Sequence, residues 1–194
     1  MSKGIQTKNA IVDEALDLVS TGGLGGLSIG TLAQATGMSK SGLFAHFGSK
    51  EQLQLSVLQS ASERFIDIVL APALKQPRGE PRIVAMFENA MSQWEDHLPG
   101  GCIFHAVSAE LDDQPGPARD FLIKTQVDRQ DMIRRAAEIA IEEGHFRKDL
   151  DVDQFVFELG SIPAAYHYSR RSLGRPDAKK RAQRAFAALL ARSH

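Results

Sequence analysis

Apolar side chains recur every three or four residues along most of this chain, which is the spacing of one face of an α-helix. No segment shows the apolar–polar alternation that predicts a half-buried strand. Breaks rich in proline and glycine separate the periodic segments, as expected for loops between helices. From residue 49 onwards the pattern predicts helices over residues 49–74, 83–97, 102–111, 118–143, 152–172 and 177–191. The chain is therefore predicted to be all-α.

Residues 28–50 form the most informative segment. Ser28 is the expected N-cap of a short helix, and Leu32 lies on its apolar face. Gly37 can end that helix in the left-handed conformation at little steric cost, and Ser39 can cap the next helix. Two short helices joined by a turn that contains glycine are typical of a helix-turn-helix DNA-binding unit. The alternative is an ordinary helical hairpin with solvated polar faces.

The second short helix has small and polar residues between its apolar ones. We expect Leu43, Phe44 and Phe47 to anchor it to the body of the protein. Small side chains would let the helix lie deep in the major groove, where Lys, Ser and His can donate to phosphates or base edges. The residues predicted to face DNA from this helix are Lys40, Ser41, Gly42, Ala45 and His46.

The next helix begins with a capping pattern. Ser49 and Gln52 form the Ser-x-x-Gln arrangement of a capping box. Lys50 then lies in the first turn, beside free N–H groups that favour an anion. The start of this helix, with Lys50, is therefore a place where an anion would be favoured.

The order and spacing of these features resemble the N-terminal domain of the tetracycline-repressor (TetR) family. The resemblance covers a first helix over residues 11–19, the glycine pair at 22–23, the two short helices and the tail Phe47–Glu51. It implies a three-helix DNA-binding domain over residues 1–50. It also implies a larger helical domain over residues 51–194, which binds a ligand and dimerises.

The family pattern also implies a set of DNA contacts. Phe44 stands where the family often has a tyrosine, Gly42 where a threonine is frequent, and Gly30 where a basic residue often reaches DNA. These departures remove contacts that relatives use. The DNA-binding residues that the resemblance implies, together with the caps, are Ser28, Thr31, Ser39, Lys40, Ser41, Gly42, Ala45, His46 and Lys50.

Composition limits the mode of DNA binding and the expected location. The formal net charge is −1, and residues 1–50 contain four lysines against three acidic residues. Any positive surface must therefore be local. Cys102 is the only cysteine, which excludes an intramolecular disulfide. Neither a signal peptide nor a long apolar run is evident, so we expect a soluble cytoplasmic protein that does not enter a membrane.

Two apolar stripes on the last two predicted helices suggest an association surface. Pairing two such helices with those of a second copy gives a four-helix arrangement, and in the TetR family the last two helices usually form the dimer interface. The alternative is that the stripes close the core of one copy. Pro163 should kink the first of these helices or open one of its backbone bonds. The predicted homodimer interface is Phe155, Leu159, Ile162, Tyr166, Phe186, Leu189 and Leu190.

The middle helices carry a candidate pocket for a small hydrophobic or amphipathic effector. Methionines and aromatic residues around a few polar groups suit an adaptable ligand site, although each residue could instead be plain core. Cys102 and His105 lack a third ligand at metal spacing, so neither a metal nor a cofactor is predicted. The predicted pocket consists of Met86, Phe87, Met91, Trp94, Phe104, His105, Phe121, Tyr166 and His167.

Together these features predict a ligand-responsive DNA-binding transcriptional regulator. We expect a repressor that binds a palindromic operator as a dimer and is released by a small molecule. Enzymatic activity is not expected, because the chain has no Gly-rich phosphate loop and no Gly-x-Ser-x-Gly motif. Two alternatives stay open: a DNA-binding protein without a ligand, and an all-helical small-molecule-binding protein or enzyme whose helix-turn-helix is only scaffold.

Overall fold

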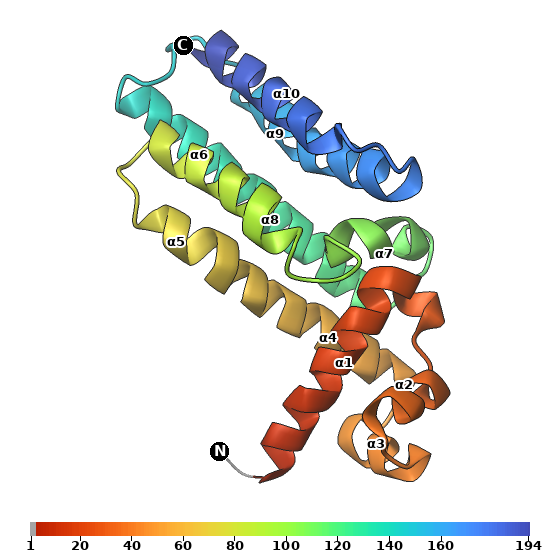
Figure 1. The fold of residues 1–194 in the computed structure, drawn as a ribbon. Coiled ribbons are helices and arrows are strands. Elements are labelled where there is room, and N and C mark those ends of the chain that lie inside the picture. Colours follow the sequence, from red (N-terminus) through yellow and green to blue (C-terminus); the bar gives the residue numbers. More distant parts are fainter. Residues whose placement is uncertain (1–2) are drawn as a thin grey trace. The chain divides into compact units, whose positions relative to one another are not determined.

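The computed structural model describes residues 3–194, and every regular element in this range is a helix (Figure 1). The prediction of an all-α protein is confirmed. In chain order the elements are α1 (Lys3–Gly26), α2 (Ile29–Thr36), α3 (Lys40–Phe47), α4 (Lys50–Phe65), η1 (Ile66–Leu70), α5 (Ala71–Leu74), α6 (Glu80–Asn89), η2 (Ala90–Trp94), α7 (Ile103–Leu111), α8 (Pro117–Glu142), α9 (Val152–His167), η3 (Tyr168–Ser172) and α10 (Ala178–Ser193), where η marks a π-helical segment.

The helices form two compact units, each with its own core. The first unit contains the residues up to Arg64 together with His97–Thr125. In this unit α1 packs against α7 and α2, and α2 packs against α3. Its fully buried side chains include Ile11, Leu16, Leu27, Leu32, Leu43 and Leu53.

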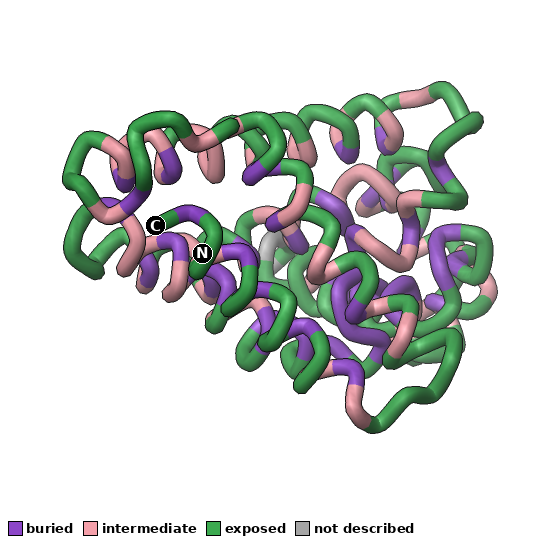
Figure 2. The backbone as a smooth tube through the Cα atoms, turned by 90° about the horizontal axis from the view of Figure 1, so that it is seen from above, coloured by how far each residue is buried: buried purple, intermediate pink, exposed green. Residues whose placement is uncertain are grey.

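The second unit contains Phe65–Asp96 and Gln126–His194. Here α5 lies beside α6, and α9 lies along α10 (Figure 1). Buried positions recur along one side of the long helices, while the other side is exposed (Figure 2). The core of this unit includes Ile83, Phe87, Met91, Phe146, Phe155 and Phe186.

The helices follow the sequence pattern closely. The helix predicted over 49–74 is confirmed as the uninterrupted run of α4, η1 and α5, and the other helices predicted beyond it lie within three residues of their expected ends. Pro163 does not end α9, which continues to His167. Because proline has no N–H, the carbonyl four residues earlier loses one backbone donor. In residues 3–194, no helix is both long enough and apolar enough to cross a membrane.

Candidate functional site

The start of α2 is fixed by a reciprocal capping box. The Ser28 Oγ accepts a hydrogen bond from the Thr31 backbone N–H, and the Thr31 Oγ1 accepts one from the Ser28 N–H, both at 3.0 Å. The helix ends at Gly37, whose φ of 67° is left-handed. The predicted roles of Ser28 and Gly37 are confirmed. The sequence analysis missed the role of Thr31 in the cap, since capping boxes usually have Glu or Gln at this position.

The second helix of the motif is capped in a similar way. The Ser39 Oγ accepts a hydrogen bond from the Gly42 N–H at 3.1 Å, as predicted, and lies 3.2 Å from the Ser41 Oγ. Leu43 and Phe47, four residues apart, are buried on the inner face of α3. The helix is therefore held by its cap at one end and by its apolar face along its length.

The outer face of α3 differs from the prediction at one position. Lys40, Ser41 and Ala45 are exposed as expected, and Gly42 and His46 are partly exposed. Phe44, which was expected to anchor the helix, is 50% exposed. The prediction for Phe44 is wrong because its neighbour Leu43 already faces inward, and each step along a helix turns the side chain by about 100°. Position 44 therefore shares the outer face with positions 40, 41 and 45.

The first turn of α4 adds a second positive charge to this region. The Ser49 Oγ accepts a hydrogen bond from the Gln52 N–H at 3.1 Å, which confirms the predicted cap. Lys50 is exposed at the first position of the helix. On α1, the Lys8 ammonium lies 5.5 Å from the centre of the Phe47 ring, within the range of a cation–π contact.

The predicted effector residues are divided between the two units. Phe104 is buried in the first unit, where His105 and Phe121 are partly exposed. The others lie in the second unit, and Phe87 stacks on Phe186 of α10 with ring centres 3.9 Å apart. Phe87 is thus in part a core residue, whatever else it contacts. The predicted residues of the second unit are Met86, Phe87, Met91, Trp94, Tyr166 and His167.

The second unit also contains an amphipathic cluster that the sequence analysis found only in part. Trp94 packs edge-on against Phe65 with ring centres 5.3 Å apart. The Arg129 guanidinium lies 4.1 Å from the centre of the same Phe65 ring. Helical periodicity assigns Phe65 to an ordinary buried face and Arg129 to an ordinary exposed face. No feature of the sequence therefore indicated that these two side chains are in contact.

Polar groups lie in the same unit. A carboxylate oxygen of the buried Glu95 and a ring nitrogen of His167 are within 4.8 Å of each other. Burial raises the pKa of the neighbouring Tyr166, and the negative charge of Glu95 raises it further. Tyr166 is therefore neutral at physiological pH. A carboxylate, an imidazole and a phenol in the same unit as these two aromatic rings suit an amphipathic molecule.

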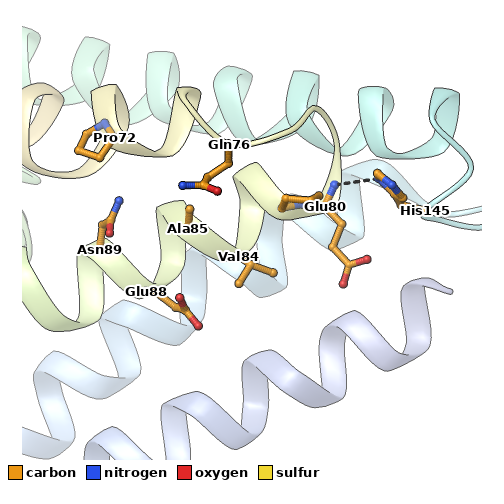
Figure 3. A pocket seen from close by; sticks show the side chains of 9 residues that line it. Pro72, Gln76, Glu80, Val84, Ala85, Glu88, Asn89 and His145 are labelled. Atoms are coloured by element: carbon orange, nitrogen blue, oxygen red, sulfur yellow. Dashed lines mark hydrogen bonds between the residues drawn. The ribbon is translucent and has the colours of Figure 1, made fainter.

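A separate groove of about 550 Å³ lies in the second unit between α5 and α6, and its lining extends along the length of α6 (Figure 3). Glu80, Glu88 and Asn89 line it from α6, and Gln76 lines it from the preceding loop. At one end the His145 Nδ1 accepts a hydrogen bond from the Glu80 N–H at 3.3 Å, which caps α6. None of the predicted effector residues lines this groove.

The apolar stripes predicted to bind a second copy fill the core of one copy. Five of the seven side chains are buried there, and the other two, Ile162 and Leu190, pack against the same core. These five side chains are only 1–7% exposed, so their role in a dimer interface stays a prediction, and most of the surface open to a partner on these helices lies at other positions. Periodicity identifies the buried face of a helix but not what buries it. The buried residues are Phe155, Leu159, Tyr166, Phe186 and Leu189.

Comparison with known proteins matches both parts of the chain to one family. Residues 11–57 match the model of bacterial regulatory proteins of the tetR family, and residues 79–186 match the tetracyclin repressor-like C-terminal domain. No curated protein sequence matches the chain.

Solved structures give the same fold. A TetR transcriptional regulator from Chloroflexus aurantiacus is 25% identical with a TM-score of 0.85, over 98% of this chain and 96% of that one. A regulator from Cytophaga hutchinsonii is 18% identical with a TM-score of 0.87 over the same shares. A putative transcriptional regulator from Saccharomonospora viridis, solved in complex with choline, is 18% identical with a TM-score of 0.83 over 96% of each chain. With its capped helix-turn-helix and its matches at both ends, the chain belongs to the tetR family and is a ligand-responsive, DNA-binding transcriptional regulator.

Proposed function

We propose that this regulator represses transcription by binding a near-palindromic operator as a homodimer. The observation that carries the proposal is the outer face of α3, where Lys40, Ser41, Phe44 and Ala45 are exposed on a helix fixed by its cap and by its buried face. Two such helices would enter successive major grooves about 34–36 Å apart. Because operators are in genomic DNA, we place the protein in the cytoplasm.

The predicted DNA-binding residues are proposed to have different roles, depending on whether the side chain has a donor free to reach DNA. Lys40 and Ser41 are proposed to reach base edges, and Lys50 to bind a phosphate. The Thr31 Oγ1 has one proton, and it points to the backbone carbonyl of Ser28 at 3.0 Å or of Gly26 at 3.3 Å. We therefore propose that Thr31 positions α2 rather than donating to DNA.

A second copy is proposed to bind the outer faces of α9, η3 and α10. Phe157 and Tyr168 are 68% and 58% exposed, and both Ser161 and Ala164, which lie between them at helical spacing, are exposed. Small side chains between two aromatic ones let paired helices approach closely. On α10 the exposed positions at matching spacing are Arg184, Ala187, Ala188 and Ala191.

The effector is proposed to be a small amphipathic molecule. The support is the cluster in the second unit, where the rings of Phe65 and Trp94 lie in the same unit as the polar groups of Glu95 and His167. The Saccharomonospora viridis regulator, which has the same fold, was solved in complex with the small molecule choline. Such a ligand releases DNA only to the extent that it binds the DNA-free conformation more tightly.

The test of DNA binding is selection of genomic fragments by the purified full chain, followed by sequencing and footprinting. Recovery of a palindromic site protected by a dimer would support the proposal, and the neighbouring genes would indicate candidate effectors. No enrichment over bulk DNA at low salt would refute it and would favour the reading of the helix-turn-helix as scaffold.

Effector binding has an internal probe, because Trp94 is the only tryptophan and is 1% exposed. Candidate compounds that both quench its fluorescence and release the selected DNA fragment would support the proposal. Compounds that release DNA without any change in Trp94 fluorescence would place the effector elsewhere in the protein.

A further inference from the structure

The last residues of α1, beyond the kink at Gly23, are held by side chains on helices that lie far away in the sequence. The Gly25 N–H donates a hydrogen bond of 2.9 Å to the Glu110 Oε2 on α7, 85 residues later. The Gln54 Nε2 on α4 donates to the carbonyl of Leu24 at 3.4 Å. Leu24 and Gly25, both in the first unit, are thus each bonded to a side chain from another helix.

These bonds continue into the cap of α2. The Thr31 Oγ1 lies 3.3 Å from the Gly26 carbonyl oxygen, and it also accepts the Ser28 N–H. The Leu24 carbonyl and the Gly25 N–H belong to one peptide unit, which moves as a rigid group, and the Gly26 carbonyl lies two peptide units further along the chain. The Glu110 carboxylate is therefore linked to the first turn of the helix-turn-helix through one short run of backbone.

Glycines make room for this arrangement. Gly23 has a φ of 69°, and a Cβ at this position would lie 1.7 Å from the Glu110 Oε1. At Gly100, ahead of α7, a Cβ would lie 1.7 Å from the Ser20 carbonyl oxygen, and the Gly100 N–H donates to the Ser20 Oγ at 3.0 Å. The chain thus brings α7 against the end of α1 closely enough for the carboxylate to reach Gly25.

We propose that Glu110 is a positioning residue for DNA recognition: its bond to Gly25 sets the orientation of α2 and, through α2, of α3. The inference rests on the proposed function and adds a residue outside the DNA-binding motif to it. Gly25 lies in the region that matches the N-terminal family model, and Glu110 in the region that matches the C-terminal one. A movement of α7 would break the bond, so the same contact can report the state of the C-terminal region to the DNA-binding helices.

The geometry predicts a specific kind of defect. A carboxylate accepting a backbone N–H makes a charge-assisted hydrogen bond, which is stronger than a neutral one. Loss of the bond should misalign α3 without removing any lysine that binds a phosphate. We expect Glu110→Ala to weaken binding to the selected operator about tenfold, while binding to random DNA changes less than about twofold and its salt dependence is unchanged.

The experiment compares Glu110→Ala with Glu110→Gln and with a control. The Gln variant keeps an oxygen that can accept the Gly25 N–H, so it should restore most of the operator affinity. Glu63→Ala removes the same charge from an exposed position on α4 and should bind DNA as the unchanged protein does. The Gly25 amide proton should shift upfield in the nuclear magnetic resonance spectrum of Glu110→Ala only. Equal operator binding by Glu110→Ala and Glu63→Ala would overturn the proposal, as would an equal loss on operator and random DNA.

Gly23→Ala gives a second route if Glu110→Ala does not fold, and where both variants fold the pair forms a double-mutant cycle. Gly23→Ala should displace the carboxylate and weaken operator binding by at least as much as Glu110→Ala does. In the combined variant the two losses should be less than additive, because the clash is gone. Additive losses would contradict a shared mechanism. The Gly25 amide shift is independent of DNA, so it still reports the contact if the full chain selects no operator and the proposed function fails.

Discussion

The helix-turn-helix and the α9–α10 pair relate to the sequence in opposite ways. In α2 and α3 single residues set the structure: Ser28 and Ser39 cap the two helices, and Gly37 ends the first. In α9 and α10 a wide apolar stripe on each helix buries against the shared core, in addition to the Asp151 side chain that caps the start of α9. The first region is therefore specified by local chemistry and the second by packing.

This difference explains which predictions succeeded. A cap depends on a residue and its near neighbours, so it can be identified from sequence. An apolar stripe predicts only that one face of a helix is buried, and it does not predict what covers that face. In α9 the buried Phe155 and the exposed Phe157 are two residues apart, and only the structure shows which of them remains for a partner.

The largest expected effect comes from substituting each of these two phenylalanines in turn and comparing the stability of the two variants. Phe155→Ala removes a side chain that is 1% exposed and should lower the free energy of unfolding by about 3–5 kcal/mol, because it leaves a cavity in the core. Phe157→Ala should change the free energy of unfolding of the monomer by less than about 0.5 kcal/mol. Denaturant unfolding at low protein concentration measures both.

The same pair tests the proposed dimer surface. Sedimentation of Phe157→Ala over a range of concentrations should show a weaker dimer. A dimer as strong as that of the unchanged protein would place the interface elsewhere, and a large loss of monomer stability would contradict the exposure of Phe157.

The next effect concerns discrimination between bases. Lys40→Ala should lose about 1–3 kcal/mol of preference at one base position of the operator, since a lysine can bind a guanine edge in the major groove. The measurement is the affinity for a set of operators that each carry one changed base pair. Uniform weakening across the set would instead identify Lys40 as a phosphate contact.

Lys50 is the counterpart of Lys40, because it is proposed to bind a phosphate and therefore to have no preference for a base. Lys50→Ala should weaken binding to all sequences alike and reduce the slope of log affinity against log salt by about 1, because one fewer phosphate is neutralised. Titrations at several salt concentrations give the slope. An unchanged slope would remove Lys50 from the phosphate contacts.

A smaller effect is expected from restoring a hydroxyl on the outer face of α3. Phe44 is 50% exposed, so Phe44→Tyr should fold unchanged and gain a donor for a phosphate, worth about 0.5–1.5 kcal/mol. The salt slope should stay the same, because the new group carries no charge. Comparing the affinity of this variant with that of Phe44→Ala separates the hydroxyl from the ring; if the tyrosine variant binds no better than the unchanged protein, position 44 does not reach the phosphates.

Much of the fold and part of the site could thus be predicted from the sequence. The helices and the caps of α2 and α3 follow from apolar spacing and from Ser and Gly at helix ends. The exposure of Phe44 could have been inferred, since Leu43 and Phe47 already define the inner face. The contact of Glu110 with Gly25 could not, because a hydrogen bond across 85 residues leaves no local pattern. The same holds for Arg129 above the Phe65 ring.

The smallest effect separates packing from ionisation in the second unit. Burial, followed by the charge of Glu95, raises the pKa of Tyr166 above the usual value of about 10. In the unfolded chain Tyr166 therefore loses its proton at a lower pH than in the folded protein. Its contribution to stability is complete below about pH 10 and is lost as the pH rises towards the folded pKa. The stability of the unchanged protein should fall more steeply above pH 10 than that of Tyr166→Phe, whereas the difference between them should be constant at lower pH. Parallel curves up to pH 11 would show that the phenol is not held in its neutral form by the fold.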